Sequence, residues 1–225
     1  TFATAAQVVV NKNLTIFGAG SGLTTITTSF NTGSAGDSRG WFLVPAGYDF
    51  DLSGVTLDGA GQLVYQAIRN FGTGGSAHDV VFRNIKYNAS GPTYMGVAIA
   101  AGGTGPVNVT DCAFSEIGRV GVLYYGSGVS GSSFTGNTYT GKGPGNWLDY
   151  GVEVSAGAAI TVDDCEMSGC AGVASVDGST SAAIMATDKF GPGTAATITN
   201  CDLTNNTAGI AVGYGASDAS TVVAH

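Results

Sequence analysis

Apolar and polar residues alternate over short stretches along the whole chain, and one six-residue pattern recurs. Its first and sixth positions are apolar, its third is Asn, Asp or Gly, and its fourth is an apolar residue or Cys. The second and fifth positions take any residue. Copies occupy residues 52–57, 82–87, 109–114, 134–139, 162–167 and 198–203, and an earlier one begins at residues 14–16. Alternation with a period of two predicts a short β-strand in each copy.

A second pattern follows the first at a matching interval, and it consists of Gly, an apolar residue, any residue and an apolar residue. It occupies residues 96–99, 121–124, 151–154 and 209–212. Residues 183–186 fill the place of a missing copy, with residues 172–181 as an insertion that lengthens this unit. Each unit of about 25 to 36 residues therefore holds two or three short strands.

A unit of this length has too little apolar surface to fold alone. Stacked units bury a continuous core and pair each strand with its copy in the next unit. Propeller blades are longer than these units, and the consensus of leucine-rich repeats is absent. The high content of Gly and β-branched residues excludes helical repeats. The sequence therefore predicts an all-β fold, a parallel β-helix of about six to seven coils, forming one domain over residues 1–225.

The repeat places cysteine on a ladder of inward positions. The fourth position of the pattern is taken by Val55, Ile85, Cys112, Cys165 and Cys201. One interpretation is that these cysteines are small core residues. The other is a disulfide between the stacked Cys165 and Cys201, or a link that uses Cys170, because an even number of cysteines fits a secreted protein.

The third position of the pattern forms a second ladder, which carries Asn84, Asp111, Asp164 and Asn200. Short polar side chains of this kind commonly form hydrogen bonds with the backbone at a bend. We therefore expect these residues to serve the structure of each coil.

Composition and charge exclude several classes of function. Only 11% of the residues are charged, the formal net charge is −8, and Lys and Arg form no run. Nucleic acid binding needs a basic stripe, so it is excluded. No stretch has the 18 or more consecutive apolar residues of a membrane span, which argues against membrane insertion. The sparse acidic charge suits a protein that works outside the cell.

The remaining signals concern the setting of the chain. It opens at Thr1 without a Met, and we expect it to be part of a longer secreted or surface protein. Sequons for N-glycosylation occur at Asn13, Asn88, Asn108 and Asn205. They matter only in a host that glycosylates its secreted proteins.

Two stretches resemble known β-helical proteins. Residues 12–20, Lys-Asn-Leu-Thr-Ile-Phe-Gly-Ala-Gly, together with residues 24–26, are similar to the first coil of pectin methylesterases. Residues 54–61, Gly-Val-Thr-Leu-Asp-Gly-Ala-Gly, are similar to an early coil of polygalacturonases. The chain thus resembles the pectate-lyase-like superfamily, which implies a right-handed β-helix. Adhesins and phage tailspikes share this fold, so the resemblance does not assign a function.

The catalytic motifs of that superfamily are absent or displaced. Polygalacturonases use Asn-Thr-Asp, Asp-Asp, Gly-His-Gly and Arg-Ile-Lys segments, whereas His78 lies in Ala-His-Asp. The Asp163-Asp164-Cys165 segment looks like the Asp-Asp piece but falls inside the repeat. The Gln-Asp and Asp-Phe-Ile-Phe-Gly segments of pectin methylesterases are missing. No cofactor is evident, and the Ca²⁺ of pectate lyases is the one ion that the resemblance leaves open.

Outward polar and aromatic residues on neighbouring coils are the remaining site candidates. Asp149 and Glu153 are candidate catalytic carboxylates, because glycoside hydrolysis needs two of them in one groove. Rings and cations beside them suit a saccharide, and the candidates for contact are Tyr125, Trp147, Tyr150, Arg83 and Arg119. The leading hypothesis is an extracellular structural, adhesive or assembly-forming domain that contacts polysaccharide or further copies of itself as a homo-oligomer or filament. A polysaccharide lyase or glycoside hydrolase and a non-catalytic carbohydrate-binding module are the alternatives.

Overall fold

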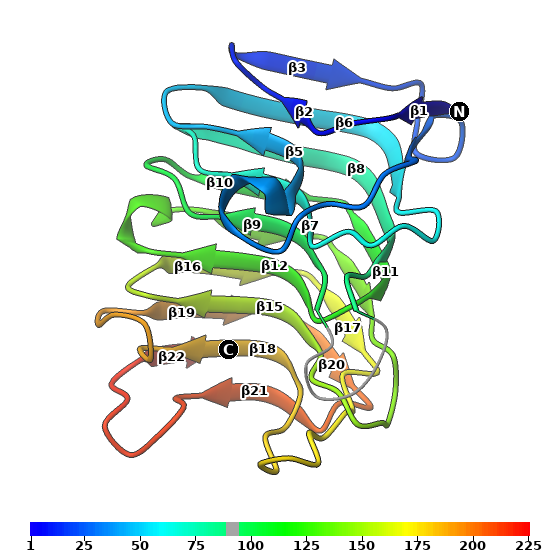
Figure 1. The fold of residues 1–225 in the computed structure, drawn as a ribbon. Helices are drawn as coiled ribbons and strands as arrows, with labels where there is room; N and C mark the ends of the chain where they lie inside the picture. The colour runs from blue at the N-terminus through cyan, green and yellow to red at the C-terminus, as the bar shows by residue number, and fades with distance from the viewer. Residues whose placement is uncertain (89–94) are drawn as a thin grey trace.

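The computed structural model describes residues 1–88 and 95–225, and it confirms a parallel β-helix of about seven turns. Successive turns stack in one column from the N-terminal to the C-terminal end of the chain (Figure 1). The strands form a 14-stranded sheet and an 8-stranded sheet, here called the first and second sheets. Neighbouring turns are joined by parallel pairing, as between β12 (Val120–Tyr125) and β15 (Tyr150–Ser155).

The strands are short, as the alternation predicts. The first sheet contains β1 (Phe2–Thr4), β3 (Leu14–Phe17), β4 (Thr25–Thr28), β6 (Asp49–Asp58), β8 (Gly74–Ile85), β10 (Val107–Thr110), β11 (Ala113–Ile117), β13 (Ser133–Thr135), β14 (Thr138–Thr140), β16 (Ala159–Asp163), β17 (Glu166–Ser168), β19 (Ala195–Thr199), β20 (Asp202–Thr204) and β22 (Thr221–Ala224). The second sheet contains β2 (Val8–Val9), β5 (Gly40–Val44), β7 (Gln66–Asn70), β9 (Val97–Ala101), β12, β15, β18 (Ala182–Thr187) and β21 (Ala208–Val212). The 3-10 helices η1 (Gly36–Arg39) and η2 (Ser127–Val129) lie in connections between strands.

The third position of the repeat marks a bend in the first sheet. Its residue has a left-handed backbone, with φ of 52° at Asp111, 53° at Asp164 and 53° at Asn200. Asn, Asp and Gly are the residues that enter this region at least cost, which explains their recurrence. The register of the strands stacks Asp164 on Asn200, as expected, and places Gly136 between Asp111 and Asp164. The Asn200 side chain donates a hydrogen bond to the Asp163 carboxylate rather than to the backbone.

One copy of the repeat was assigned wrongly from the sequence. Phe82 pairs with Leu57 and with Phe114, so it occupies the sixth position of the pattern rather than the first. The true copy is residues 77–82, and Asp79, with φ of 50°, occupies its bend. The error arose because residues 77–82 and 82–87 both fit the pattern. A single strand, β8, runs through both, and only pairing with its neighbours decides between them.

The shift moves two predicted residues to other ladders. Ile85 pairs with Ile117 instead of sharing the cysteine ladder. Asn84 belongs to a second bend, with φ of 56°, where its counterpart is Glu116 with φ of 54°. A similar shift affects the second pattern, since residues 98–101 rather than 96–99 align with residues 121–124. The Ala183 copy is confirmed, because Ile184 pairs with Val152 and with Ile210.

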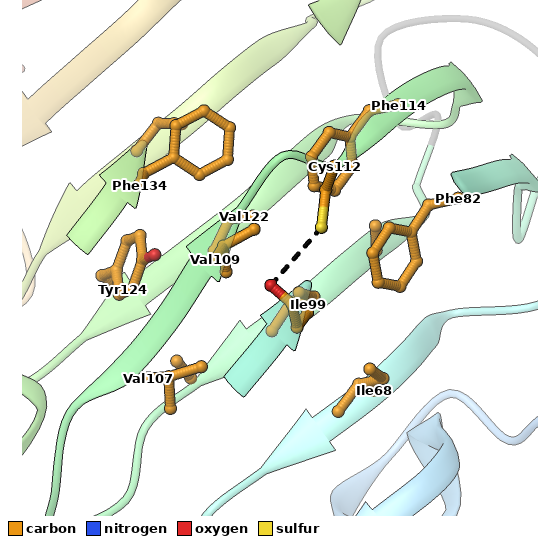
Figure 2. Packing of buried hydrophobic residues seen from close by; sticks show 14 of the residues in the cluster. Ile68, Phe82, Ile99, Val107, Val109, Cys112, Phe114, Val122, Tyr124 and Phe134 are labelled. Atoms are coloured by element: carbon orange, nitrogen blue, oxygen red, sulfur yellow. Dashed lines mark hydrogen bonds between the residues drawn. The ribbon is translucent and has the colours of Figure 1, made fainter. Parts of the chain in front are cut away.

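Aromatic side chains stack along the inside of the first sheet. The rings of Phe82 and Phe114 are parallel within 6° with centroids 5.0 Å apart, and Phe134 follows Phe114 at 5.8 Å. Figure 2 shows these rings and Cys112 in the same core. Phe82, Phe114 and Tyr139 pair with one another on successive turns, and Phe134 packs beside Phe114, so the core is continuous along the axis.

The cysteine ladder holds free thiols. Cys112, Cys165 and Cys201 each donate an Sγ–H to the carbonyl two residues earlier, at 3.1–3.2 Å. Burial raises the pKa of Cys112 to about 12. The influence of the two thiols on each other raises the pKa of Cys165 and lowers that of Cys201. Cys170 is a buried free thiol outside this ladder. A disulfide between Cys165 and Cys201 stays a prediction for oxidising conditions.

The two end turns are less well covered than the middle of the column. Partly buried core residues concentrate there, with Leu14 and Ile16 in the first turn and Leu203, Ile210 and Val222 in the last. No helix within the described part of the chain has the length and apolar character needed to cross a membrane.

Candidate functional site

A second apolar cluster lies on the outer face of the second sheet, separate from the core inside the column. In-register pairing aligns Val97, Val120, Tyr150 and Ala182 on four neighbouring turns. These residues pack with Leu148 and Ala174. The cluster therefore forms an apolar floor outside the core, which gives this sheet a second packing surface.

A groove of about 340 Å³ lies on this floor. Its walls come from connections that are far apart in sequence. The predicted insertion at residues 172–181 is confirmed as the long connection before β18, and it supplies Asp177 and Ser179. Lys189 and Phe190 come from the connection after β18, and Arg39 from η1. The groove therefore exists only because the turns are stacked.

Glu153 is the charged residue at the centre of the groove floor. It lies on β15 between Leu123 and Met185 in the neighbouring strands. The side chain is half-buried, and no hydrogen bond or ion pair to it occurs among the residues that the structure describes. Burial raises the pKa of Glu153, and this effect outweighs the positive charges of Arg119 and Lys189, which lower the pKa. A desolvated carboxylate in an open groove is typical of a functional residue.

Replacing Glu153 with Gln is expected to change how stability depends on pH. The raised pKa means that the folded state keeps the Glu153 proton to higher pH than the unfolded state, so stability falls as pH rises from about 4.3 through the raised value. Glu153→Gln removes this loss. In urea unfolding, the variant should be more stable than the wild type at pH 7 and match it within about 0.5 kcal/mol at pH 3.

The matched control for this experiment is Glu166→Gln, because Glu166 is exposed on β17 outside the groove. Lower stability of Glu153→Gln at pH 7 would contradict the prediction. It would mean that Arg119 and Lys189 more than offset the cost of burying the carboxylate.

Exposed aromatic rings line one side of the groove. Tyr125 is 40% exposed, and Phe190 and Tyr214 are each 54% exposed. The Tyr125 and Phe190 centroids are 6.2 Å apart, and Lys189 Nζ lies 3.4 Å from the Tyr214 ring centroid. Sequence analysis missed Lys189, Phe190 and Tyr214. The feature of the sequence that could have indicated this side of the groove is Phe190, an aromatic residue in the Gly- and Pro-containing segment 190–193, where the repeat does not require an apolar side chain.

Three of the predicted site residues join Glu153 in the groove. Tyr125, Tyr150 and Arg119 all line it. The Tyr150 hydroxyl donates a hydrogen bond to the Thr180 carbonyl at 3.2 Å, and burial raises the pKa of Tyr150 to about 12. Arg119 donates to the Met95 sulfur at 3.5 Å, and its positive charge acts on both Tyr150 and Glu153. These residues share one groove because neighbouring turns are in register.

The other three predicted residues lie elsewhere. Asp149 is fully buried and paired with Lys142, so its carboxylate does not face Glu153 across the groove. Trp147 folds back on its own loop, where its Nε1–H donates to the Gly143 carbonyl at 3.1 Å. Arg83 forms an ion pair with Asp58 at 2.7 Å on the first sheet. The alternation of apolar and polar residues indicates side-chain direction only within a strand. Asp149 and Trp147 precede β15, so the alternation did not place their side chains.

The four sequons have different settings. Asn13, Asn108 and Asn205 are exposed, as glycosylation requires. The side chain of Asn108 accepts hydrogen bonds from the backbone and hydroxyl groups of Ser133, at 3.1 and 3.0 Å. Asn88 is described, but the next two residues of its sequon lie outside the described residues. Glycosylation at these sites stays a prediction.

The charged groups of the groove are mixed in sign, with Arg39, Arg119 and Lys189 beside Glu153 and Asp177. Within residues 1–88 and 95–225, no three His, Cys, Asp or Glu side chains are grouped so that they could hold a metal ion. The described groove thus presents charges of both signs beside its exposed rings.

The profile of the right-handed β-helix region matches residues 73–223, about two thirds of the chain. The chain belongs to the right-handed β-helix family. This agrees with the stacked parallel turns and is consistent with the pectate-lyase-like resemblance. No curated protein and no solved structure matches the chain. Members of a β-helix family share an architecture, so the function has to be argued from the groove.

Proposed function

We propose that the chain is a saccharide-binding β-helix domain of an extracellular protein, and that the groove on the second sheet is its binding site. The observation that supports this most is the row of exposed rings, Tyr125 and Phe190, beside the desolvated Glu153. Aromatic faces pack against the apolar faces of sugar rings, and charged side chains bond the hydroxyls. Such a site suits an adhesive role on polysaccharide.

A second candidate function is glycoside hydrolysis in the same groove. Glu153 favours it, because burial raises its pKa and a general acid must hold a proton at working pH. Asp177 is the other carboxylate that lines the groove. It lies on the exposed insertion, where hydrogen bonds from Ser179 lower its pKa. Binding is the preferred function, because an exposed loop holds the second carboxylate with less precision than catalysis requires.

Binding can be measured by affinity electrophoresis with polygalacturonate, xylan and a β-glucan. Tyr125→Ala and Phe190→Ala are each expected to weaken retention by at least about tenfold, corresponding to about 1.4 kcal/mol of lost ring contact. Both rings are exposed, so the variants should keep the fold. Phe17→Ala is the matched control, because Phe17 is 83% exposed on the first sheet, far from the groove lining.

Retention of none of the three polysaccharides, or equal weakening by Phe17→Ala, would contradict the binding proposal. The same mixtures should be assayed for new reducing ends and for absorbance of unsaturated products. Turnover that is lost in Glu153→Gln would support hydrolysis instead.

Sedimentation velocity of the unliganded protein tests the self-association expected at the open end turns, and a single monomeric species would exclude it.

A further inference from the structure

The connection between β14 and β15 carries a buried pair of complementary reactive groups. Lys142 Nζ lies 3.0 Å from Asp149 Oδ2, and the two side chains are only 9% and 0% exposed. The Lys142 amine also donates to the Ile117 carbonyl at 3.1 Å. Trp147 covers the amine, with its ring centroid 6.0 Å from Nζ. The amine and the carboxyl group are therefore held in contact and largely shielded from water.

Two further donors act on the Asp149 carboxyl group. The Tyr139 hydroxyl donates to Oδ1 at 2.5 Å, and the Lys142 backbone N–H donates to Oδ2 at 2.7 Å. Tyr139 is itself fully buried, on β14. Each carboxyl oxygen therefore has its own donor, and the Lys142 amine lies beside Oδ2.

Burial acts on the two ionisable groups in opposite directions. It lowers the pKa of Lys142 and raises the pKa of Asp149, while their mutual attraction opposes both changes. The buried surroundings therefore favour the neutral amine and the protonated carboxyl group more than an aqueous environment does. A desolvated lysine amine is a nucleophile, and fixed contact with its target removes much of the entropic barrier to reaction.

We propose that Lys142 and Asp149 condense into an intramolecular amide bond. The neutral Nζ attacks Asp149 Cγ, and the Tyr139 hydroxyl stabilises the negative charge that develops on Oδ1. The bond from Cγ to Oδ2 then breaks. Oδ2 leaves as water, taking the carboxyl proton and one proton from Nζ, so the step needs no oxidant or cofactor.

The amide would close a small covalent ring over residues 142–149. This ring lies directly before β15, which carries Tyr150 and Glu153 into the groove. A cross-link there would hold the start of β15 against β14 under mechanical or proteolytic stress. The proposal rests only on the buried pair, so it stands or falls independently of saccharide binding.

Mass spectrometry of the full, denatured chain tests the proposal directly. The wild-type protein should be lighter than its sequence by one water. Trypsin should fail to cut after Lys142 and should release residues 120–189 as one peptide that lacks one water, with fragment ions joining positions 142 and 149. Asp149→Asn should lose ammonia instead of water, because its amide nitrogen is then the leaving group.

Lys142→Arg should have the full mass of its sequence, and Lys189→Arg is the matched control that should keep the loss of water. A wild-type chain of full mass that trypsin cuts after Lys142 would overturn the proposal and leave an ordinary buried ion pair. Loss of water that persists in Lys142→Arg would also overturn it, because the loss would then come from another residue. The wild-type measurement does not depend on how well any variant folds.

Discussion

Replacing Phe114 with alanine is expected to lower the free energy of unfolding by about 3–5 kcal/mol. The Phe114 ring is 2% exposed and lies between those of Phe82 and Phe134, at 5.0 and 5.8 Å, with Tyr139 at 6.2 Å. Truncation removes the transfer free energy of the ring and leaves a cavity that strands paired on both sides cannot close. Two neighbouring turns lose a contact at once.

Urea unfolding followed by circular dichroism measures this effect. Phe114→Leu should lose less stability because it leaves a smaller cavity. Phe17→Ala should change stability by no more than about 0.5 kcal/mol, because its ring is 83% exposed. If Phe114→Ala and Phe17→Ala unfold at the same urea concentration, the aromatic stack does not hold the turns together.

Asp149→Leu is expected to cost about 3–5 kcal/mol of unfolding free energy, because it removes the negative charge that compensates a buried cation. The variant strands the Lys142 amine, which is 9% exposed, and removes the acceptor of the Tyr139 hydroxyl. This loss is expected whether the wild-type pair is an ion pair or an amide, since the variant lacks the Asp149 carboxyl group in either case.

The double variant Lys142→Met with Asp149→Leu separates charge from packing. Removing both partners should recover most of the stability, because apolar groups of similar volume often replace a buried pair at little cost. Thermal unfolding of the wild type, the single variant and the double variant at pH 7 makes the comparison. A double variant as unstable as Asp149→Leu would show that the loss comes from packing in the connection before β15.

The amino-acid sequence determined the architecture because each turn repeats the same physical problem. Inward positions must be apolar in every turn, and the bend must carry a residue that accepts a left-handed backbone, as Asp111, Asp164 and Asn200 do. These local demands recur at intervals that show directly in the sequence. They predicted the stacked turns, the long insertion before β18 and the outward position of Glu153 on β15.

Only the tertiary structure decided the register of β8 and the contents of the groove. The segments 77–82 and 82–87 both satisfy the pattern, and pairing of Phe82 with Leu57 and Phe114 selects the first. Asp149 turned inward because Lys142 and Tyr139 offer it buried partners, which the sequence does not reveal. Lys189 reached the groove because stacking brings distant connections together. Contacts between turns depend on the relative placement of segments far apart in the chain, and no local pattern encodes that placement.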